Sequence, residues 1–417
     1  MTSIEDLVSV EFETGDKPES FEKVIRPSTF FSWILGVGIA RPLKSWKIAT
    51  FFLRFVNFAI CSSIVAYGAI DFFFFGSVFK SDTFKIMYYM NKVACYISSY
   101  YYVFHGLVQY KKWPILMERI AAIDKKMRHC GLECNNRSIR CFQIFTLIMT
   151  CLLGPISLVS HALYYLYTQP EEIFASDLLL YHTISQSLCI NFEFDLIVMG
   201  IYARFREINR GIRRSGEQIT AGRIIMEIRK AREVHHALCA LVRYINSIHG
   251  MHLLLSSLNS FTMVVATLFR IYMGVVEGID KFMMINNVIW LTYTAQFALT
   301  CFICTWARRE SSRTGIIIHD IVLRRLPKGP RPCDLYSIDI TRAPEDPELS
   351  LRNEINDFSA QLDHSIIAFT ACEFFIMDNN LLTNFVGVIT TYLIILVQFY
   401  APEGVCGGMS TTPSVEL

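Results

Sequence analysis

Long apolar stretches alternate with strongly charged segments along the chain. A helix needs about 20 predominantly apolar residues to cross the hydrocarbon core of a bilayer, and seven stretches reach this length. We therefore expect seven transmembrane helices, at about residues 50–77, 85–108, 142–166, 177–202, 250–277, 284–307 and 381–400. The pattern predicts an all-α, polytopic membrane protein.

Lys and Arg gather in alternate connecting segments. They are frequent before the first expected helix, between the second and third, between the fourth and fifth, and after the sixth. The other loops contribute Lys80 and Lys281. By the positive-inside rule we expect a cytoplasmic N-terminus and an extracellular C-terminus, which is the opposite order to a G-protein-coupled receptor. The glycosylation sequon at Asn136 then lies on the cytoplasmic side, where it should stay unmodified.

The basic loops are predicted to be largely helical. Residues 203–248 place charged and apolar positions at helical spacing, so the fourth and fifth spans should continue as amphipathic helices well beyond the bilayer. Five prolines between 326 and 348 indicate a loop, and a helix is expected to resume over 349–377. We expect a cytoplasmic N-terminal segment over residues 1–47 and helices one to six with their extensions over 48–308. An anchor segment over 309–378, the last helix over 379–400 and an extracellular tail over 401–417 should follow.

The composition agrees with a membrane protein and offers little for catalysis. Hydrophobic residues make up 53% of the 417 residues and charged residues 18%, against about a quarter charged in soluble domains. The net charge of +2 argues against nucleic acid as a partner. Among the 13 cysteines, Cys130 with Cys134 or Cys301 with Cys304 could be read as a metal pair, but neither pair has a partner pair at usable spacing. No phosphate-binding loop or nucleophile elbow is present. We expect no metal, no cofactor and no enzymatic activity.

A polar stripe runs along the last expected helix. Its members recur at intervals of 4, 3, 4 and 7 residues and share one helical face, with Ile394 or Ile395 filling the gap: Asn380, Asn384, Gly387, Thr391 and Gln398. An unpaired amide in hydrocarbon costs several kcal/mol, about 2–7 by transfer data, so this face must meet water or other polar groups. Two interpretations are open: hydrogen bonds to neighbouring helices of the same chain, or the lining of a pore.

The end of this helix carries a recognisable motif. Thr391 and Tyr392 are followed by five apolar residues and then by Gln398 and Phe399. This spacing resembles the TYhhhhhQF signature of insect gustatory receptors, which are related to insect odorant receptors, and the surrounding run from Ala368 resembles the same part of that family.

The resemblance implies a tastant-gated, non-selective cation channel in the plasma membrane of sensory neurons. It also implies a homo- or heterotetramer with other gustatory receptor subunits, the last helix of each around a central pore, and a ligand pocket in the outer half of the spans. The long helical extensions of the fourth to sixth spans would then form a cytoplasmic anchor layer. We expect a bitter-type ligand because bitter-type receptors are the most numerous branch of the family. A sugar is the alternative, and no sequence feature decides between the two. A G-protein-coupled receptor or a transporter is the alternative from another class; the loop charges disfavour the first, and no inverted repeat supports the second.

The motif and the stripe suggest roles for individual residues. Gln398, with the Ile394 or Ile395 level, is expected to form the outer constriction of the pore, and Thr391, Asn384 and Asn380 its inner path. Tyr392 and Phe399 should pack against neighbouring helices. Polar and aromatic residues in the outer halves of the spans are ligand-pocket candidates, each with helix–helix bonding or snorkelling as the simpler explanation: Lys92, Tyr96, His161, Tyr164, Tyr181, His182, Gln186, Arg270, Tyr293 and Gln296.

Three further charged residues lie in the expected spans. Glu193 and Asp195 should pair with basic residues of the anchor rather than touch a ligand. Arg54, near the start of the first span, is expected to extend its guanidinium toward the membrane surface.

Overall fold

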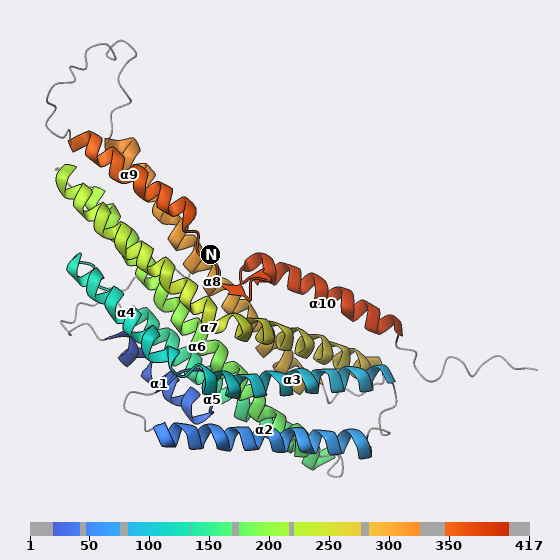
Figure 1. Cartoon of the computed structure of the whole chain (residues 1–417). Coiled ribbons are helices and arrows are strands. Elements are labelled where there is room, and N and C mark those ends of the chain that lie inside the picture. The colour runs from blue at the N-terminus through green and yellow to red at the C-terminus, as the bar shows by residue number, and fades with distance from the viewer. Residues whose placement is uncertain are drawn as a thin grey trace, which may run out of the picture.

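The computed structural model describes residues 20–41, 47–75, 82–134, 136–168, 175–216, 221–276, 283–325 and 347–399. Within them the regular secondary structure is helical apart from one short hairpin (Figure 1). The elements are α1 (Phe21–Ile34), α2 (Lys47–Phe75), α3 (Asp82–Val108), α4 (Lys112–His129), α5 (Arg137–Thr168), α6 (Ala175–Gly216), α7 (Ala221–Val276), α8 (Met283–Arg325), α9 (Pro347–His364), β1 (Thr370–Ala371), β2 (Phe375–Ile376) and α10 (Asn379–Phe399).

Each of the seven expected spans falls on one helix, in the order α2, α3, α5, α6, α7, α8 and α10. Among the described residues, α2, α6, α7, α8 and α10 are long and apolar enough to cross a bilayer. The all-α prediction is confirmed, with one helix at the place of each expected span. The direction in which the termini face stays a prediction.

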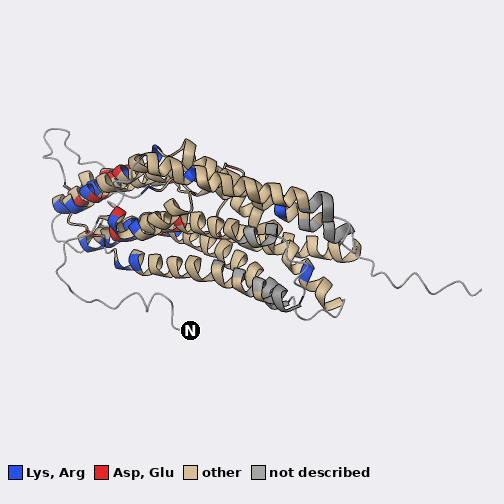
Figure 2. Cartoon of the chain, turned by 90° about the horizontal axis from the view of Figure 1, so that it is seen from below, with Lys and Arg blue, Asp and Glu red and all other residues tan. Residues whose placement is uncertain are grey.

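Three helices extend far beyond the length that a bilayer requires. α6, α7 and α8 contain 42, 56 and 43 residues, so α7 is about 84 Å long at 1.5 Å per residue, against a hydrocarbon core of about 30 Å. Their extensions lie together with α4 and α9 (Figure 1), and the charged residues gather mainly at this end of the molecule (Figure 2). The predicted amphipathic extensions are thus present, and they form a helical layer continuous with the spans.

The expected helix over 349–377 is wrong in its second half. α9 ends at His364, and the chain then runs extended into the antiparallel β1–β2 hairpin. Buried and exposed positions alternate here with a period of two, since Ile367 and Phe369 are buried while Ile366 is exposed. Because the run is mostly apolar, its sequence did not distinguish an extended segment from a helix.

Arg54 also differs from expectation. Its side chain is buried, and its Nη2 donates a hydrogen bond to the carbonyl oxygen of Gly38 at 3.3 Å. The segment after α1 passes over α2 at this point, with Gly36 and Gly38 in the left-handed region at φ +67° and +65°. A Cβ on Gly38 would lie 2.8 Å from Oε2 of Glu193. Arg54 is therefore held by a connecting segment instead of reaching toward the membrane surface.

Two helices, α1 and α4, lie outside the predicted set. α4 buries one face, including Trp113, Leu116 and Ile120, at the spacing of an amphipathic helix. Both contribute to the main buried cluster of apolar side chains, which also contains residues of α6, α7, α8 and α9. α1 and α4 are therefore packed parts of the fold, held against the long helices.

Candidate functional site: the terminal helix and its surroundings

The start of α10 is attached to α8 by side-chain hydrogen bonds. Oδ1 of Asp378 accepts the backbone N–H of Leu381 at 3.0 Å, in the position of an N-cap, and its Oδ2 accepts Nη1 of Arg308 at 3.3 Å. The hydroxyl of Thr305 donates to Oδ1 of Asn379 and accepts its backbone N–H, both at 3.0 Å. These bonds fix where α10 leaves the bundle.

The hairpin before α10 is held by α7. The side-chain amide of Asn246 donates to the carbonyl oxygen of Ala368 at 2.7 Å, and its Oδ1 accepts the N–H of Thr370 at 3.4 Å. Gly250 lies so close to the turn that a Cβ there would be 3.1 Å from the backbone nitrogen of Cys372. Both ends of the segment that leads into the last helix are thus tied to long helices.

One face of α10 packs against the bundle. Phe385 is buried and stacks on Phe297 of α8 with ring centroids 4.3 Å apart, and Phe261 of α7 meets Phe385 and Tyr392 at 6.0 and 5.5 Å. Ile389 is the other buried residue of the helix. The contact of Tyr392 with α7 is of the kind expected for this motif residue, although about half of its side chain remains exposed.

The polar stripe lies on the opposite side of the same helix. At about 100° per residue, its centre is about 150° from the face that carries Phe385 and Ile389. Its members and the motif residue beyond them are exposed in the single chain: Asn380, Asn384, Thr391, Ile394, Ile395, Gln398 and Phe399. Within the described residues no hydrogen bond joins the three stripe amides to another helix, and the hydroxyl of Thr391 bonds the carbonyl oxygen of Gly387 in its own helix. The interpretation as an intramolecular hydrogen-bonding stripe finds no contact to support it.

The two glutamines among the ligand-pocket candidates serve the helix packing. Nε2 of Gln186 donates to the carbonyl oxygen of Leu35 at 3.1 Å, which ties α6 to the segment after α1. Nε2 of Gln296 donates to Oδ2 of Asp195 at 2.8 Å, which joins α8 to α6. Asp195 therefore has an amide partner and not the basic anchor residue that we expected.

The other described candidates do not share one environment. Lys92 on α3 and Tyr293 on α8 are buried, whereas His182 on α6 and Arg270 on α7 are half-buried. Tyr96 on α3 places its hydroxyl against Gly68 of α2, where an added Cβ would clash with it. The side chains of three further candidates lie outside the described residues: His161, Tyr164 and Tyr181. The described contacts assign none of the ten to a ligand.

A buried histidine cluster escaped the sequence analysis. The rings of His105, His249 and His252, from α3 and α7, lie with neighbouring centroids 5.9 and 5.6 Å apart. Nε2 of His252 bonds Oδ1 of Asn191 at 2.9 Å, and Nε2 of His105 bonds the carbonyl oxygen of Ile248 at 2.9 Å. The sequence feature that could have revealed this cluster is the presence of histidines at the ends of two apolar spans. They fasten α3 and α6 to α7 close to the hairpin.

Comparison with solved structures identifies the fold. The insect olfactory receptor OR5 from Machilis hrabei aligns with a TM-score of 0.58 at 12% sequence identity, over 91% of this chain and 97% of that chain. The structure of OR5 in complex with eugenol aligns with a TM-score of 0.54 at 13% identity, over 91% and 99%. At these identities the likeness establishes a shared seven-helix fold.

Two named relatives in Drosophila melanogaster match part of the chain. The protein that carries the name gustatory receptor 2a is 26% identical over 184 residues, and the one named gustatory receptor 28b is 26% identical over 180 residues. The matches cover 43% and 41% of this chain, and 42% and 34% of the relatives' own length. The similarity to these relatives thus spans less than half of each protein.

The family assignment rests on a match over nearly the whole chain. The profile of the 7tm chemosensory receptor family matches residues 25–332 and 335–401, which include every described helix from α2 to α9 and the whole of α10. The expectation that the chain is a receptor and not an enzyme is confirmed by this match. Together with the seven-helix fold and the Thr-Tyr…Gln-Phe motif on α10, it shows that the chain belongs to the 7tm chemosensory receptor family, which includes the insect gustatory receptors.

Proposed function

We propose that this chain is a subunit of a ligand-gated, non-selective cation channel that opens on binding a small organic tastant. In the proposed assembly, four copies in the plasma membrane of a sensory neuron turn the polar stripes of α10 toward a common axis. One observation carries the proposal. The stripe is exposed in the single chain, on the side of α10 away from its own bundle.

The physical support comes from the cost of leaving this face in lipid. Amide groups without partners in hydrocarbon are destabilising, so Asn380, Asn384 and Gln398 need water or another subunit. A ring of amides and hydroxyls around a hydrated path meets that need. Exposed Ile394 and Ile395 on the same side can close such a path by excluding water. The stripe has no carboxylate, which favours weak selection among cations.

The ligand is proposed to be a bitter-type compound, with a sugar as the alternative. OR5, which has the same fold, has been solved with eugenol, a small aromatic molecule. The spans of this chain bring both aromatic and polar side chains inward, Tyr293 and Lys92 among them, so a compound with a ring and a few polar groups suits them best. Testing the channel against a panel of bitter compounds and sugars distinguishes the two ligand classes.

The channel function can be tested by recording currents from cells that express the chain alone, without added G protein. We expect tastant-evoked cation currents whose conductance changes in Gln398→Ala and Thr391→Ala. Thr390→Ala is the matched control, because Thr390 is also exposed and also bonds the carbonyl oxygen four residues earlier, but points about 100° away from Thr391. Unchanged conductance and gating in the Gln398→Ala, Thr391→Ala pair would refute the pore assignment. Currents that require a G protein would favour the receptor class that we reject.

A further inference from the structure

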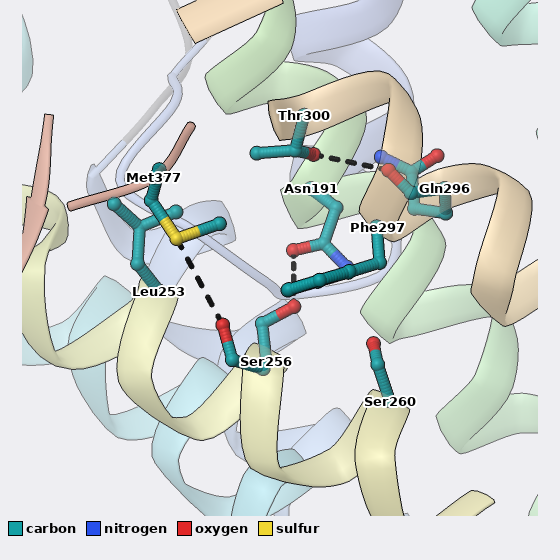
Figure 3. A pocket seen from close by; sticks show the side chains of 9 residues that line it. Asn191, Leu253, Ser256, Ser260, Gln296, Phe297, Thr300 and Met377 are labelled. Carbon is teal, nitrogen blue, oxygen red and sulfur yellow. Dashed lines mark hydrogen bonds between the residues drawn. The ribbon is translucent and has the colours of Figure 1, made fainter. Parts of the chain in front are cut away.

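A small cavity lies between α6, α7 and α8, and Figure 3 shows side chains of the three helices converging on it. Its volume is about 10 Å³, which is the room needed by one water molecule. Some of the polar groups around it bind one another, since Oδ1 of Asn191 accepts the hydroxyl of Ser256 at 2.7 Å and the sulfur of Met377 accepts that of Ser257 at 3.9 Å. This cavity has no room for a larger ligand. A surface that is suited to a partner lies on α1 instead.

The outer face of α1, made of Lys23, Arg26, Phe30 and Ile34, combines two basic residues with two large apolar ones. All four are exposed, and they follow one another at intervals of three or four residues, so they share one side of the helix. Phe30 is 50% exposed and Ile34 is 42% exposed. The acidic residue of α1, Glu22, is half-buried at one edge of this face. The outer face therefore carries an excess of positive charge beside an apolar patch.

The inner face of α1 is fixed to α6, which determines where the outer face points. The ring of Phe21 lies 4.8 Å from the guanidinium of Arg204. The hydroxyl of Ser32 lies 3.2 Å from the sulfur of Cys189, within hydrogen-bond distance. α1 cannot turn its outer apolar residues into the bundle without losing these contacts.

The end of α1 lies at the level where α2 begins to expose apolar side chains. Nε1 of Trp33 donates to Oγ1 of Thr50 at 3.0 Å, which ties the last turn of α1 to the first turn of α2. The ring of Trp33 lies 5.8 Å from that of Phe30. The large apolar residues in the first turns of α2 are exposed, as expected for contact with lipid: Ile48, Phe51, Phe52 and Phe55. The outer face of α1 is thus adjacent to a surface that faces lipid.

We propose that the outer face of α1 binds anionic phospholipids of the cytoplasmic leaflet. Phe30, Trp33 and Ile34 lie at the boundary between acyl chains and headgroups, where Trp is common and where an amphipathic helix buries its apolar side. Arg26 precedes Trp33 by seven residues, which is about 10 Å along the helix axis. The headgroup region is about 5–8 Å thick on each side of the bilayer, so Arg26 and Lys23 meet the charged parts of the headgroups.

Charge and position favour an anionic lipid over other occupants. The positive-inside rule places this side of the protein in the cytoplasm, and the cytoplasmic leaflet carries the anionic lipids. A neutral lipid satisfies Phe30 and Ile34 but gives Lys23 and Arg26 no net attraction. A protein partner would have to occupy the space beside Phe51 of α2, where lipid is expected. Because all of these contacts lie within one chain, the lipid site does not depend on the proposed channel function.

The test measures backbone hydrogen exchange over residues 21–34 in the purified full-length protein, which is reconstituted in nanodiscs. One set of nanodiscs contains phosphatidylcholine alone, and the other contains phosphatidylcholine with phosphatidylserine. We expect exchange of α1 to be slower with phosphatidylserine by about 25-fold, which is about fivefold for each of the two basic residues. Raising the salt concentration to about 1 M should remove most of this difference, because the Debye length falls to about 3 Å.

The decisive variant combines Lys23→Gln with Arg26→Gln. Removing both charges should abolish the difference between the two lipid compositions. The matched control combines Lys125→Gln with Lys126→Gln, which removes the same charge from exposed positions of α4. These residues are about 20 Å along α4 from its start at Lys112, so the control should keep the difference.

Two results would overturn the proposal. Equal exchange of α1 in both lipid compositions would mean that neutral lipid or a protein neighbour covers this face. A full difference in the Lys23→Gln, Arg26→Gln variant would mean that the anionic lipid binds elsewhere. If this variant does not fold, Phe30→Ala with Ile34→Ala serves in its place. It should speed exchange of α1 in the anionic nanodiscs, and an unchanged rate would also count against the site.

Discussion

The ion pair between Arg204 and Asp124 offers a quantitative test of the anchor layer. Arg204 of α6 is 1% exposed, and its Nε and Nη2 donate to the two carboxylate oxygens of Asp124 on α4, each at 2.8 Å. Nη1 donates to the carbonyl oxygen of Gly200 at 2.7 Å, and the guanidinium lies 4.8 Å from the ring centroid of Phe21. One residue thus joins α6, α4 and α1, which makes it a suitable place to test whether the layer folds as one unit with the spans.

Asp124→Ala should destabilise the protein by about 3 kcal/mol. Removing one partner of a buried ion pair costs about 3–5 kcal/mol because the remaining charge stays buried without compensation. We expect the lower end because Asp124 is 16% exposed and Arg204 keeps its bond to Gly200. With an unfolding entropy of about 2.1 cal/mol/K per residue, this loss lowers the melting temperature of a 417-residue chain by about 3 °C.

The measurement is thermal unfolding of the detergent-solubilised protein, with Asp320→Ala as the matched control. Asp320 pairs with Arg324 at 2.7 Å, but the two side chains are 52% and 74% exposed. Exposed pairs contribute about 0–1 kcal/mol, so the control should melt within about 1 °C of the wild type. A double variant with Asp124→Leu and Arg204→Met should recover most of the loss, because no unpaired charge remains. Equal destabilisation by Asp124→Ala and Asp320→Ala would refute the reasoning.

Two further predictions concern close packing. Gly106→Ala should destabilise the protein by about 2 kcal/mol, because its Cβ would clash with the carbonyl oxygen of Gly38. Gly222→Ala, where a Cβ meets nothing within 4 Å, should be neutral or stabilising in the same melting assay. Phe385→Ala removes the stack on Phe297 and should loosen α10, which we expect to raise channel activity in the absence of tastant. If Phe385→Ala leaves the basal current unchanged at equal surface expression, the prediction for α10 is wrong. If Gly106→Ala and Gly222→Ala melt at the same temperature, the prediction for the glycines is wrong.

The elements that the sequence predicted well are those whose pattern is local. An apolar run of sufficient length has few stable conformations other than a helix in a bilayer, so the seven spans could be located. Periodic charges over 203–248 likewise predicted that α6 and α7 extend beyond the membrane. The hairpin at 370–376 was missed, because a run of apolar residues satisfies a helix and a buried strand equally well. Contacts of Asn246 across more than 120 residues of chain select the extended form.

In the candidate site, too, local features could be predicted from the sequence and contacts between distant residues could not. The spacing of the stripe on α10 was sufficient to place its members on one face, but exposure of that face was decided by where Phe385 and Ile389 pack. The partners of charged residues in the spans were unpredictable, since Arg54 is held by the backbone of Gly38 and Asp195 by an amide of α8. The position of a residue in a span restricts the depth of its side chain in the membrane, but it does not determine which residue that side chain contacts.

By itself, the sequence determined that the protein is a seven-span helical membrane protein, that its connecting segments are basic on one side, and that its last helix carries a polar edge and the motif of a chemosensory family. These properties follow from composition and periodicity within single segments. The tertiary structure decided which buried charges meet, that the chain before α10 is a hairpin, and that the polar edge faces away from its own bundle. These depend on contacts between segments distant in sequence, where packing selects among partners that local propensity leaves equivalent.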